Sequence, residues 1–341
     1  MVLDSALREQ VAENAKACDK GEKPGRYILP ALGEAGLIDT DYATSADTLR
    51  ELAAEDLSVG FTTWAARMTL EYLKRADTDY SRSLAERIAA GTNPGVTAMA
   101  GAFKEAAGVG ELDLTAEKDG EGYVVSGKIG WASNLYDDAI VVTGAKTAEG
   151  EKFLFAFEAG HEGVEFGQPF GLLGLNATES AWVSFDNVRV PAEQVLTRDF
   201  DTFMKGVRPV FVVMQVAECL GVAEASAEAA SQKLDGMKAT FADDVEQVRA
   251  DIGSVRARQS ATITSISAGD AVDPEALLVL RLDAANAAVK AANIEVRVAG
   301  GAGYASSSPA SRRYREASFL PVQSPSEAQL RYELQRVREG K

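Results

Sequence analysis

An indole and a hydroxyl two positions apart are the residues of this sequence best suited to hold a planar ring. Trp131 and Ser133 lie in the segment Trp-Ala-Ser-Asn, residues 131–134 of the 341-residue chain. In a β-strand such a pair points to one face. The indole would then cover a flavin ring while the hydroxyl donates to the ring edge, where hydrogen bonds tune its electronics. On these two residues alone, a core tryptophan beside a turn-forming Ser-Asn pair is the favoured interpretation.

The residues around this pair have the pattern of a strand-rich region. Between residues 96 and 198, short runs of β-branched and aromatic residues alternate with clusters of Gly and Asp. The runs that predict strands are residues 123–125, 139–143, 153–157 and 181–185. Several short strands without intervening helices favour an antiparallel sandwich or barrel.

Helical patterns flank the strand-rich region on both sides. Apolar residues recur at helical spacing before the Asn-Pro-Gly break at 93–95. After residue 199, helices are predicted near 210–220 and over 242–266, 277–298 and 326–338. The sequence therefore predicts an α+β fold with three domains. They are an N-terminal helical domain (1–95), a middle antiparallel β-sandwich or barrel (96–198) and a C-terminal four-helix bundle (199–341).

The composition of the chain argues against several classes of binding partner. The formal net charge is −16, which argues against nucleic acid because phosphate binding needs a basic face. No run approaches the roughly 18 continuous apolar residues of a membrane span, and the first residues do not form a secretory signal. Two cysteines are too few for a disulfide framework or a metal cluster. We expect a cytoplasmic protein with no metal, no membrane and no nucleic-acid partner.

A series of segments resembles the acyl-CoA dehydrogenase superfamily, in order along most of the chain. The middle-domain pattern of that family is a Gly-x-Lys strand followed by Trp, an aliphatic residue, Thr or Ser, and a small polar residue. The matching segments are residues 52–60, 122–128, 131–134, 171–178, 183–191, 299–304 and 313–317. Each is weak alone, and the set is specific.

The resemblance implies FAD bound between the middle domain and the bundle, with a neighbouring subunit completing the site. The glycines after residue 299 match a turn that approaches the neighbour's cofactor, where backbone amides reach phosphate because no Cβ intrudes. Arg297 stands where the family has Gln; its planar fork suits phosphate, and an ordinary surface arginine is an equally favoured interpretation. The predicted cofactor-binding residues are Met99, Trp131, Ser133, Arg297, Gly300, Gly301, Gly303 and Ser326.

The residues that would accept a proton depart from the family pattern. The family's catalytic Glu falls on Ser324, and the alternative position used by some members falls on Val207. Neither side chain can take a proton, although a positioned base is worth about 10²–10⁴ in rate. Glu218, an acidic residue in an apolar helical run, is a weak substitute; a solvated or inter-helix face is the favoured place for it.

Further departures lie near the expected cofactor. The loop expected to line the flavin reads Thr-Ala-Met-Ala-Gly at 97–101, and the family's phosphate-binding Arg-x-x-Phe-Gly segment is missing. The departures leave three functions open. The first is hydride transfer from an acyl substrate, expected to be acyl-CoA, with a base from a partner subunit or another residue. The second is a two-component flavin monooxygenase, and the third is a non-catalytic subunit of a hetero-oligomeric dehydrogenase. The family pattern predicts a homodimer or tetramer.

Overall fold

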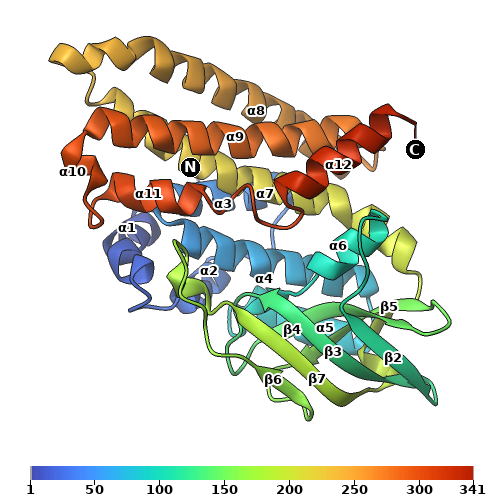
Figure 1. Cartoon of the computed structure of the whole chain (residues 1–341). Coiled ribbons are helices and arrows are strands. Elements are labelled where there is room, and N and C mark those ends of the chain that lie inside the picture. The colour runs from blue at the N-terminus through green and yellow to red at the C-terminus, as the bar shows by residue number, and fades with distance from the viewer. Residues whose placement is uncertain (1, 341) are drawn as a thin grey trace.

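The computed structural model describes residues 2–340 and places helical regions on both sides of one sheet in the chain (Figure 1). The N-terminal helices are α1 (Ser5–Asp19), α2 (Leu29–Glu34), α3 (Tyr42–Glu55), α4 (Leu57–Ala76) and α5 (Asp79–Ala89). Asp56 joins α3 to α4, and its carboxylate accepts from the backbone N–H of Ser58 at 2.7 Å, an N-cap that starts α4.

The strands occupy the middle of the chain and form one mixed sheet. They are β1 (Gly95–Thr97), β2 (Leu114–Asp119), β3 (Gly122–Ala132), β4 (Ile140–Thr147), β5 (Lys152–Glu158), β6 (Val164–Phe166), β7 (Ala181–Val190) and β8 (Val195–Thr197). The order is β6-β7-β3-β2-β4-β5-β8, with β1 paired to β4. A short helix, α6 (Ala100–Ala106), lies between β1 and β2.

The sheet corrects one detail of the predicted middle region. Most pairs are antiparallel, but β4 is parallel to both β1 and β2. Parallel neighbours need a long connection between them. Here the chain from β1 to β4 runs through α6, β2 and β3, so β4 returns beside β1 in the same direction. The α+β class with helices on either side of a strand region is confirmed.

The C-terminal region supplies the longest helices, and they pack against the N-terminal ones. They are α7 (Phe200–Ser231), α8 (Ala242–Ala268), α9 (Pro274–Ala299), α10 (Gly301–Tyr304), α11 (Pro309–Ala317) and α12 (Glu327–Arg338). Figure 1 shows α3 running beside α7, so the core of the bundle is shared with the N-terminal region. In the described chain α7 alone is long and apolar enough to span a membrane, with 89% of its apolar window buried in this core.

Two apolar cores hold these layers together. One joins the N-terminal helices to the bundle, and the second fills the inner face of the sheet around Phe153, Phe155 and Phe157. Helix α4 is buried along most of its length, because it packs against α3 and α7 as well as β1 and β4. It therefore carries side chains to the junction of all three regions.

Candidate functional site

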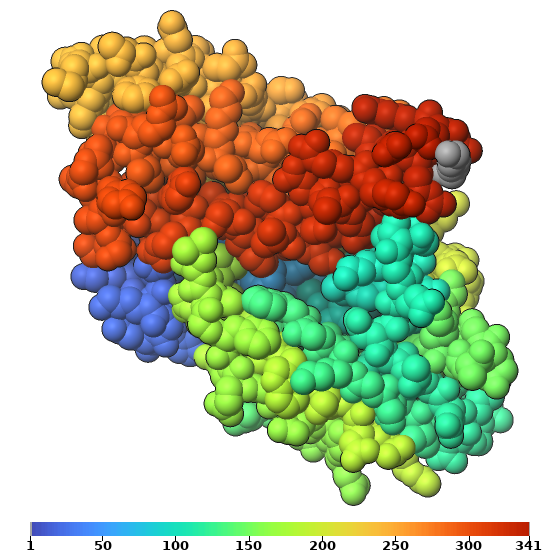
Figure 2. Space-filling view, viewed as in Figure 1, coloured from blue at the N-terminus to red at the C-terminus, as the bar shows by residue number. Residues whose placement is uncertain are grey.

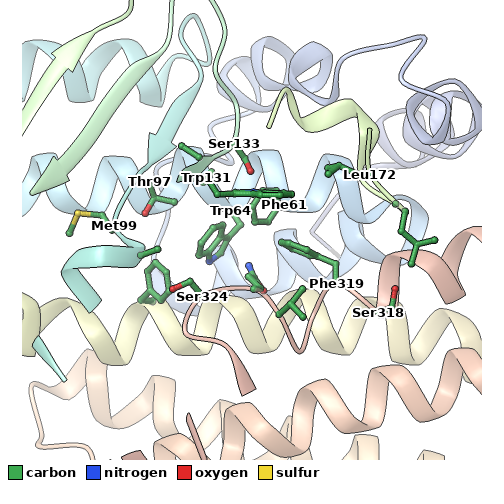
Figure 3. A pocket seen from close by; sticks show the side chains of 18 of the residues that line it. Phe61, Trp64, Thr97, Met99, Trp131, Ser133, Leu172, Ser318, Phe319 and Ser324 are labelled. Atoms are coloured by element: carbon green, nitrogen blue, oxygen red, sulfur yellow. The ribbon is translucent and has the colours of Figure 1, made fainter. Parts of the chain in front are cut away.

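A cavity of about 480 Å³ lies where the three regions of the chain meet. This volume is within the usual range of roughly 300–1,000 Å³ for small-molecule sites. In Figure 2 the junction lies between the green strand region and the red C-terminal segment. Figure 3 shows the lining side chains converging from separate segments. Those that the argument uses are Phe61, Trp64, Thr97, Met99, Trp131, Ser133, Phe211, Arg315, Phe319, Gln323 and Ser324.

Aromatic rings from two helices, α4 and α7, and from the loop after α11 form a continuous wall. Phe61 and Trp64, one helical turn apart on α4, are stacked with ring centroids 5.3 Å apart. Phe319 packs edge-on against Phe61 at 5.1 Å, and Phe211 of α7 packs edge-on against Trp64 at 5.0 Å. The indole Nε1 of Trp64 is buried without a hydrogen-bond partner. Such a wall suits a flat apolar group, and edge-to-face pairs hold its shape.

Trp131 and Ser133 lie on the opposite, strand-derived side of the cavity. Trp131 is the penultimate residue of β3 and remains 49% exposed, so it is not part of the core as the alternative interpretation required. The ladder between β3 and β7 is irregular between Ile129 and Ala132. Such irregularities re-aim side chains at a strand end. Ser133 follows directly after the strand and is half-buried at the cavity wall.

A chain of hydroxyls decides what Ser133 offers to the cavity. Thr178 donates its hydroxyl to the Leu175 carbonyl at 2.8 Å. Its oxygen must therefore accept from Ser180 Oγ, 2.8 Å away. Ser180 in turn accepts from Ser133 Oγ at 2.7 Å. Since each hydroxyl has one proton, Ser133 faces the cavity as an acceptor. In this arrangement the Ser133 proton is directed to Ser180 and not to the ring that the prediction assigned to it.

Asn134 fixes the backbone at this junction. It is fully buried and adopts a left-handed conformation with φ of 63°. Its backbone N–H donates to the Thr178 carbonyl at 2.6 Å, and its side-chain oxygen accepts from Thr62 of α4 at 3.1 Å. Asparagine is one of the few residues that tolerates this conformation. The residue therefore ties the end of β3 to α4.

The loop after α11 closes the cavity from the C-terminal side. Gln215 of α7 donates to the Ser324 carbonyl at 2.8 Å, which fixes the loop against the bundle. Ser324 lines the cavity, and its hydroxyl is buried without a partner. Ser326 is outside the lining and caps α12 instead, since its hydroxyl accepts from the Gln329 N–H at 3.4 Å.

The cavity lining carries almost no charge. Arg315 is the one charged residue among the described lining residues, and Asp19 binds both of its terminal nitrogens, at 2.6 and 2.7 Å. No carboxylate belongs to the described lining. The cavity therefore has neither a free cation nor a proton acceptor of its own on these residues. Nor do residues 2–340 contain a cluster of three or more His, Cys, Asp or Glu fit for a metal ion.

The two remaining base candidates lie behind the wall. Val207 is fully buried in α7 and does not line the cavity. Glu218, also on α7, is fully buried between helices, which corrects the solvated alternative. Burial raises its pKa from 4.5 to about 8. Its Oε2 accepts from Nε2 of Gln323 at 2.9 Å, so one side chain separates it from the cavity.

The predicted phosphate-binding residues are not part of this cavity. Arg297 lies near the end of α9, with its guanidinium carbon 4.9 Å from the ring centroid of Phe241. Gly300, Gly301 and Gly303 form the turn into α10, which Figure 1 shows at the end of the helical body. A Cβ added at Gly300 or Gly301 meets nothing within 4 Å, and Gly300 has φ of 66°. Within one subunit, this turn is therefore open on its outer side.

Sequence reasoning named Glu218 but missed the aromatic wall and the side chains of Arg281 and Gln323 behind it. The signal for the wall was the i, i+3 spacing of Phe61 and Trp64, which is equally typical of a buried helix face. The signal for the polar side chains behind the wall was Arg281, a charged residue within the otherwise apolar run 277–282. Arg281 donates to Gln323, and Gln323 donates to Glu218; the three residues are distant in sequence and meet only after folding.

Comparisons with known proteins agree with this geometry, although no protein-family model matches the chain. The short/branched chain specific acyl-CoA dehydrogenase of Bos taurus is 28% identical over 221 residues, 58% of this chain and 50% of that relative. The short-chain specific acyl-CoA dehydrogenase of Rattus norvegicus is 24% identical over 229 residues, 62% and 55% respectively. Butyryl-CoA dehydrogenase from Megasphaera elsdenii has the same fold, with a TM-score of 0.86 at 17% identity over 97% of this chain and 95% of that one.

The chain is therefore similar in sequence to acyl-CoA dehydrogenases and shares the fold of butyryl-CoA dehydrogenase. It aligns with about half the length of the curated relatives that it matches. Ser324 and Val207 stand at the two positions where the resemblance predicts a proton acceptor. The structure brings Met99, Trp131, Ser133 and Ser324 to one cavity and leaves the glycine turn and Arg297 outside it.

Proposed function

We propose that this chain is an FAD-dependent oxidoreductase that oxidises an acyl group, most simply an acyl-CoA. The observation that carries the proposal is the aromatic cavity between the end of β3 and the loop 318–324, with Trp131 at its strand side. Its volume, flat aromatic wall and unpartnered Trp64 Nε1 fit a planar heteroaromatic group. Bound FAD would supply a ring that accepts hydride from substrate.

The residues of this chain would hold the reacting groups and exclude water. Trp131 would cover the ring, Ser133 would accept a hydrogen bond at its edge, and Met99 would pack beside it. The rings of Phe61, Trp64 and Phe319 would confine the acyl chain and keep the site dry, which strengthens polar interactions inside it. The cofactor phosphates find no free cation in the described lining. Arg297 and Gly300–Gly303 would serve a neighbouring subunit, which makes the proposed enzyme a dimer or larger oligomer.

Loss of the substrate's α-proton needs an acceptor that the described lining does not provide. Glu218 is the nearest buried carboxyl identified behind the wall, and its pKa of about 8 gives it a proton affinity suited to a base near neutral pH. It would have to act through Gln323 or through a movement of that side chain. A base from a partner subunit is the other route.

The absent carboxylate also favours a second candidate, a two-component flavin monooxygenase. Reaction of reduced flavin with oxygen requires no α-proton acceptor, so a lining without Asp or Glu suits it. Oxygen-dependent turnover with a supplied reductase, set against anaerobic reduction by acyl-CoA, separates the two.

The first experiment is a flavin-band spectrum of the purified protein, followed by titration with FAD. We expect binding, and a Trp131→Ala variant that binds FAD at least tenfold more weakly, measured by quenching of flavin fluorescence. Glu228→Gln, an exposed change on α7, is the control. A colourless wild-type protein that takes up no FAD would refute the proposal and leave a non-catalytic subunit as the alternative.

A further inference from the structure

A buried amide forms part of the cavity wall, and its orientation is fixed from behind. Gln323 lines the cavity but is only 4% exposed. Its Oε1 accepts from Nη2 of Arg281 at 3.2 Å, and its Nε2 donates to Glu218 at 2.9 Å. A guanidinium only donates, so the amide cannot be reversed without placing two donors face to face. The oxygen must lie toward Arg281 and the nitrogen toward Glu218.

Arg281 and Glu218 are themselves held in place. Arg281, on α9, is 1% exposed and also donates to the Gln215 side chain at 3.1 Å and to the Leu320 carbonyl at 2.8 Å. Glu218 is fully buried on α7, and its second oxygen has no partner. Buried charged groups of this kind are often replaceable by apolar residues without loss of stability. The fold alone therefore does not explain why the wall contains this polar group.

The amide has hydrogen-bonding capacity left for a ligand. Nε2 carries two protons, and the contact to Glu218 uses one; no second acceptor for it occurs in residues 2–340. Since Gln323 belongs to the lining, its remaining N–H is available to a bound molecule, beside the unpartnered Ser324 hydroxyl and Trp64 indole N–H. Aromatic rings of Trp64, Phe211 and Phe319 form much of the surface around it.

We propose that Gln323 determines specificity by donating its free N–H to an oxygen on the acyl portion of the substrate. Arg281 and Glu218 act as positioning residues that hold the amide in this orientation. The inference rests on the proposed function and narrows its substrate class to acyl thioesters whose chain carries a neutral acceptor, such as a keto or amide oxygen. A neutral acceptor is favoured because Arg315, the one cation among the described lining residues, is paired with Asp19.

Binding of two matched ligands tests the inference. The FAD-loaded protein is titrated by calorimetry with butanoyl-CoA and with 3-oxobutanoyl-CoA, which differ by one oxygen in the chain. We expect the wild type to bind the oxo ligand about tenfold more tightly, the size of one net hydrogen bond. In Gln323→Met the preference falls to near onefold, with the affinity for butanoyl-CoA changed less than threefold.

A matched control separates recognition from packing. Gln329 is another buried amide bonded to a carboxylate, that of Glu333 on α12, and it is outside the lining. Gln329→Met should keep the tenfold preference. The positioning role is tested by rescue at Glu218. Glu218→Gln retains an acceptor for Gln323 and keeps most of the preference, whereas Glu218→Leu removes the acceptor and loses it.

The outcomes distinguish this inference from the proposed function. Equal affinity of the wild type for both thioesters overturns the role of Gln323 while leaving an acyl-CoA enzyme intact. A preference that survives in Gln323→Met does the same. Failure of the FAD-loaded protein to bind either thioester overturns both. Because the wild-type ratio is itself decisive, the test does not depend on the variants folding.

Discussion

Replacing Glu218 by Gln should make the protein less sensitive to alkaline pH. In the native state burial raises the pKa of Glu218 from 4.5 to about 8, so between these values the folded protein holds a proton that the unfolded chain has released. Stability falls with rising pH wherever the folded state binds more protons. The contribution of this carboxyl is therefore fully present below pH 4.5 and is lost as pH rises to about 8.

The size of the effect follows from the same two values. At 1.36 kcal/mol per pH unit, raising the pKa from 4.5 to about 8 corresponds to roughly 5 kcal/mol at most. This is comparable with the total stability of a typical domain, about 5–15 kcal/mol. Gln is the neutral analogue of the protonated side chain, and its oxygen still accepts from Gln323. The variant should match the wild type near pH 5 and exceed it in stability by several kcal/mol at pH 9.

Urea unfolding of both proteins at intervals from pH 5 to 9 measures this difference. Gln215 and Gln323 do not titrate, and burial raises the pKa of Cys219 to about 11, above this range. The contribution of these neighbours to the pH dependence is therefore the same in variant and wild type, and it drops out of the difference. Glu228→Gln, an exposed change on the same helix, should leave the pH profile unchanged. A difference between Glu218→Gln and wild type that stays constant from pH 5 to 9 would show that Glu218 is not a buried protonated carboxyl.

Three further predictions concern the cavity and its supports. Ser324→Glu restores a carboxylate at the wall and should raise the exchange of the α-proton of butanoyl-CoA in deuterated water by about 10²-fold or more, followed by NMR; an unchanged rate would mean that the side chain does not reach the substrate. Ser180→Ala removes the acceptor of the Ser133 proton and frees Ser133 to donate. The midpoint potential of bound FAD should fall by about 30 mV, which corresponds to one hydrogen bond in a two-electron reduction. An unchanged potential would contradict the order of the hydroxyl chain. Asn134→Ala should cost about 2 kcal/mol in urea unfolding, from the lost bond to Thr62 and a strained left-handed backbone; full stability would refute the supporting role.

Local patterns in the sequence predicted the fold class and most elements. The helix predicted over 326–338 is α12, with Ser326 as its cap, and the strands predicted around 123–125 and 153–157 lie within β3 and β5. These succeed because capping and side-chain alternation depend on near neighbours. The parallel pairing of β4 with β1 was missed because it depends on contacts between strands more than 40 residues apart, which leave no local pattern.

The same distinction separates the predicted and the missed parts of the cavity. The family resemblance led to Trp131, Ser133 and Ser324, and all three line it. The hydrogen bonding of Ser133 could not be predicted, because it depends on Ser180 and Thr178, which are distant in sequence and adjacent only in the fold. No periodicity distinguishes an aromatic residue that lines a cavity from one that fills a core.

The position of Glu218, behind the cavity wall, limits how a proton could leave a substrate bound in the cavity. A base must come within about 3 Å of the proton that it removes, directly or through one water. Glu218 accepts a hydrogen bond from Gln323, and the Gln323 side chain lies between Glu218 and the cavity. Proton transfer to Glu218 therefore requires the Gln323 amide to move or a path around it. Arg281 opposes that movement because it also holds the Leu320 carbonyl of the same loop. An Arg281→Met variant would remove the hydrogen bonds to the Gln323 side chain and to the Leu320 carbonyl. If Glu218 is the base, the variant should exchange the α-proton faster than wild type; if a partner subunit supplies the base, the variant should gain nothing.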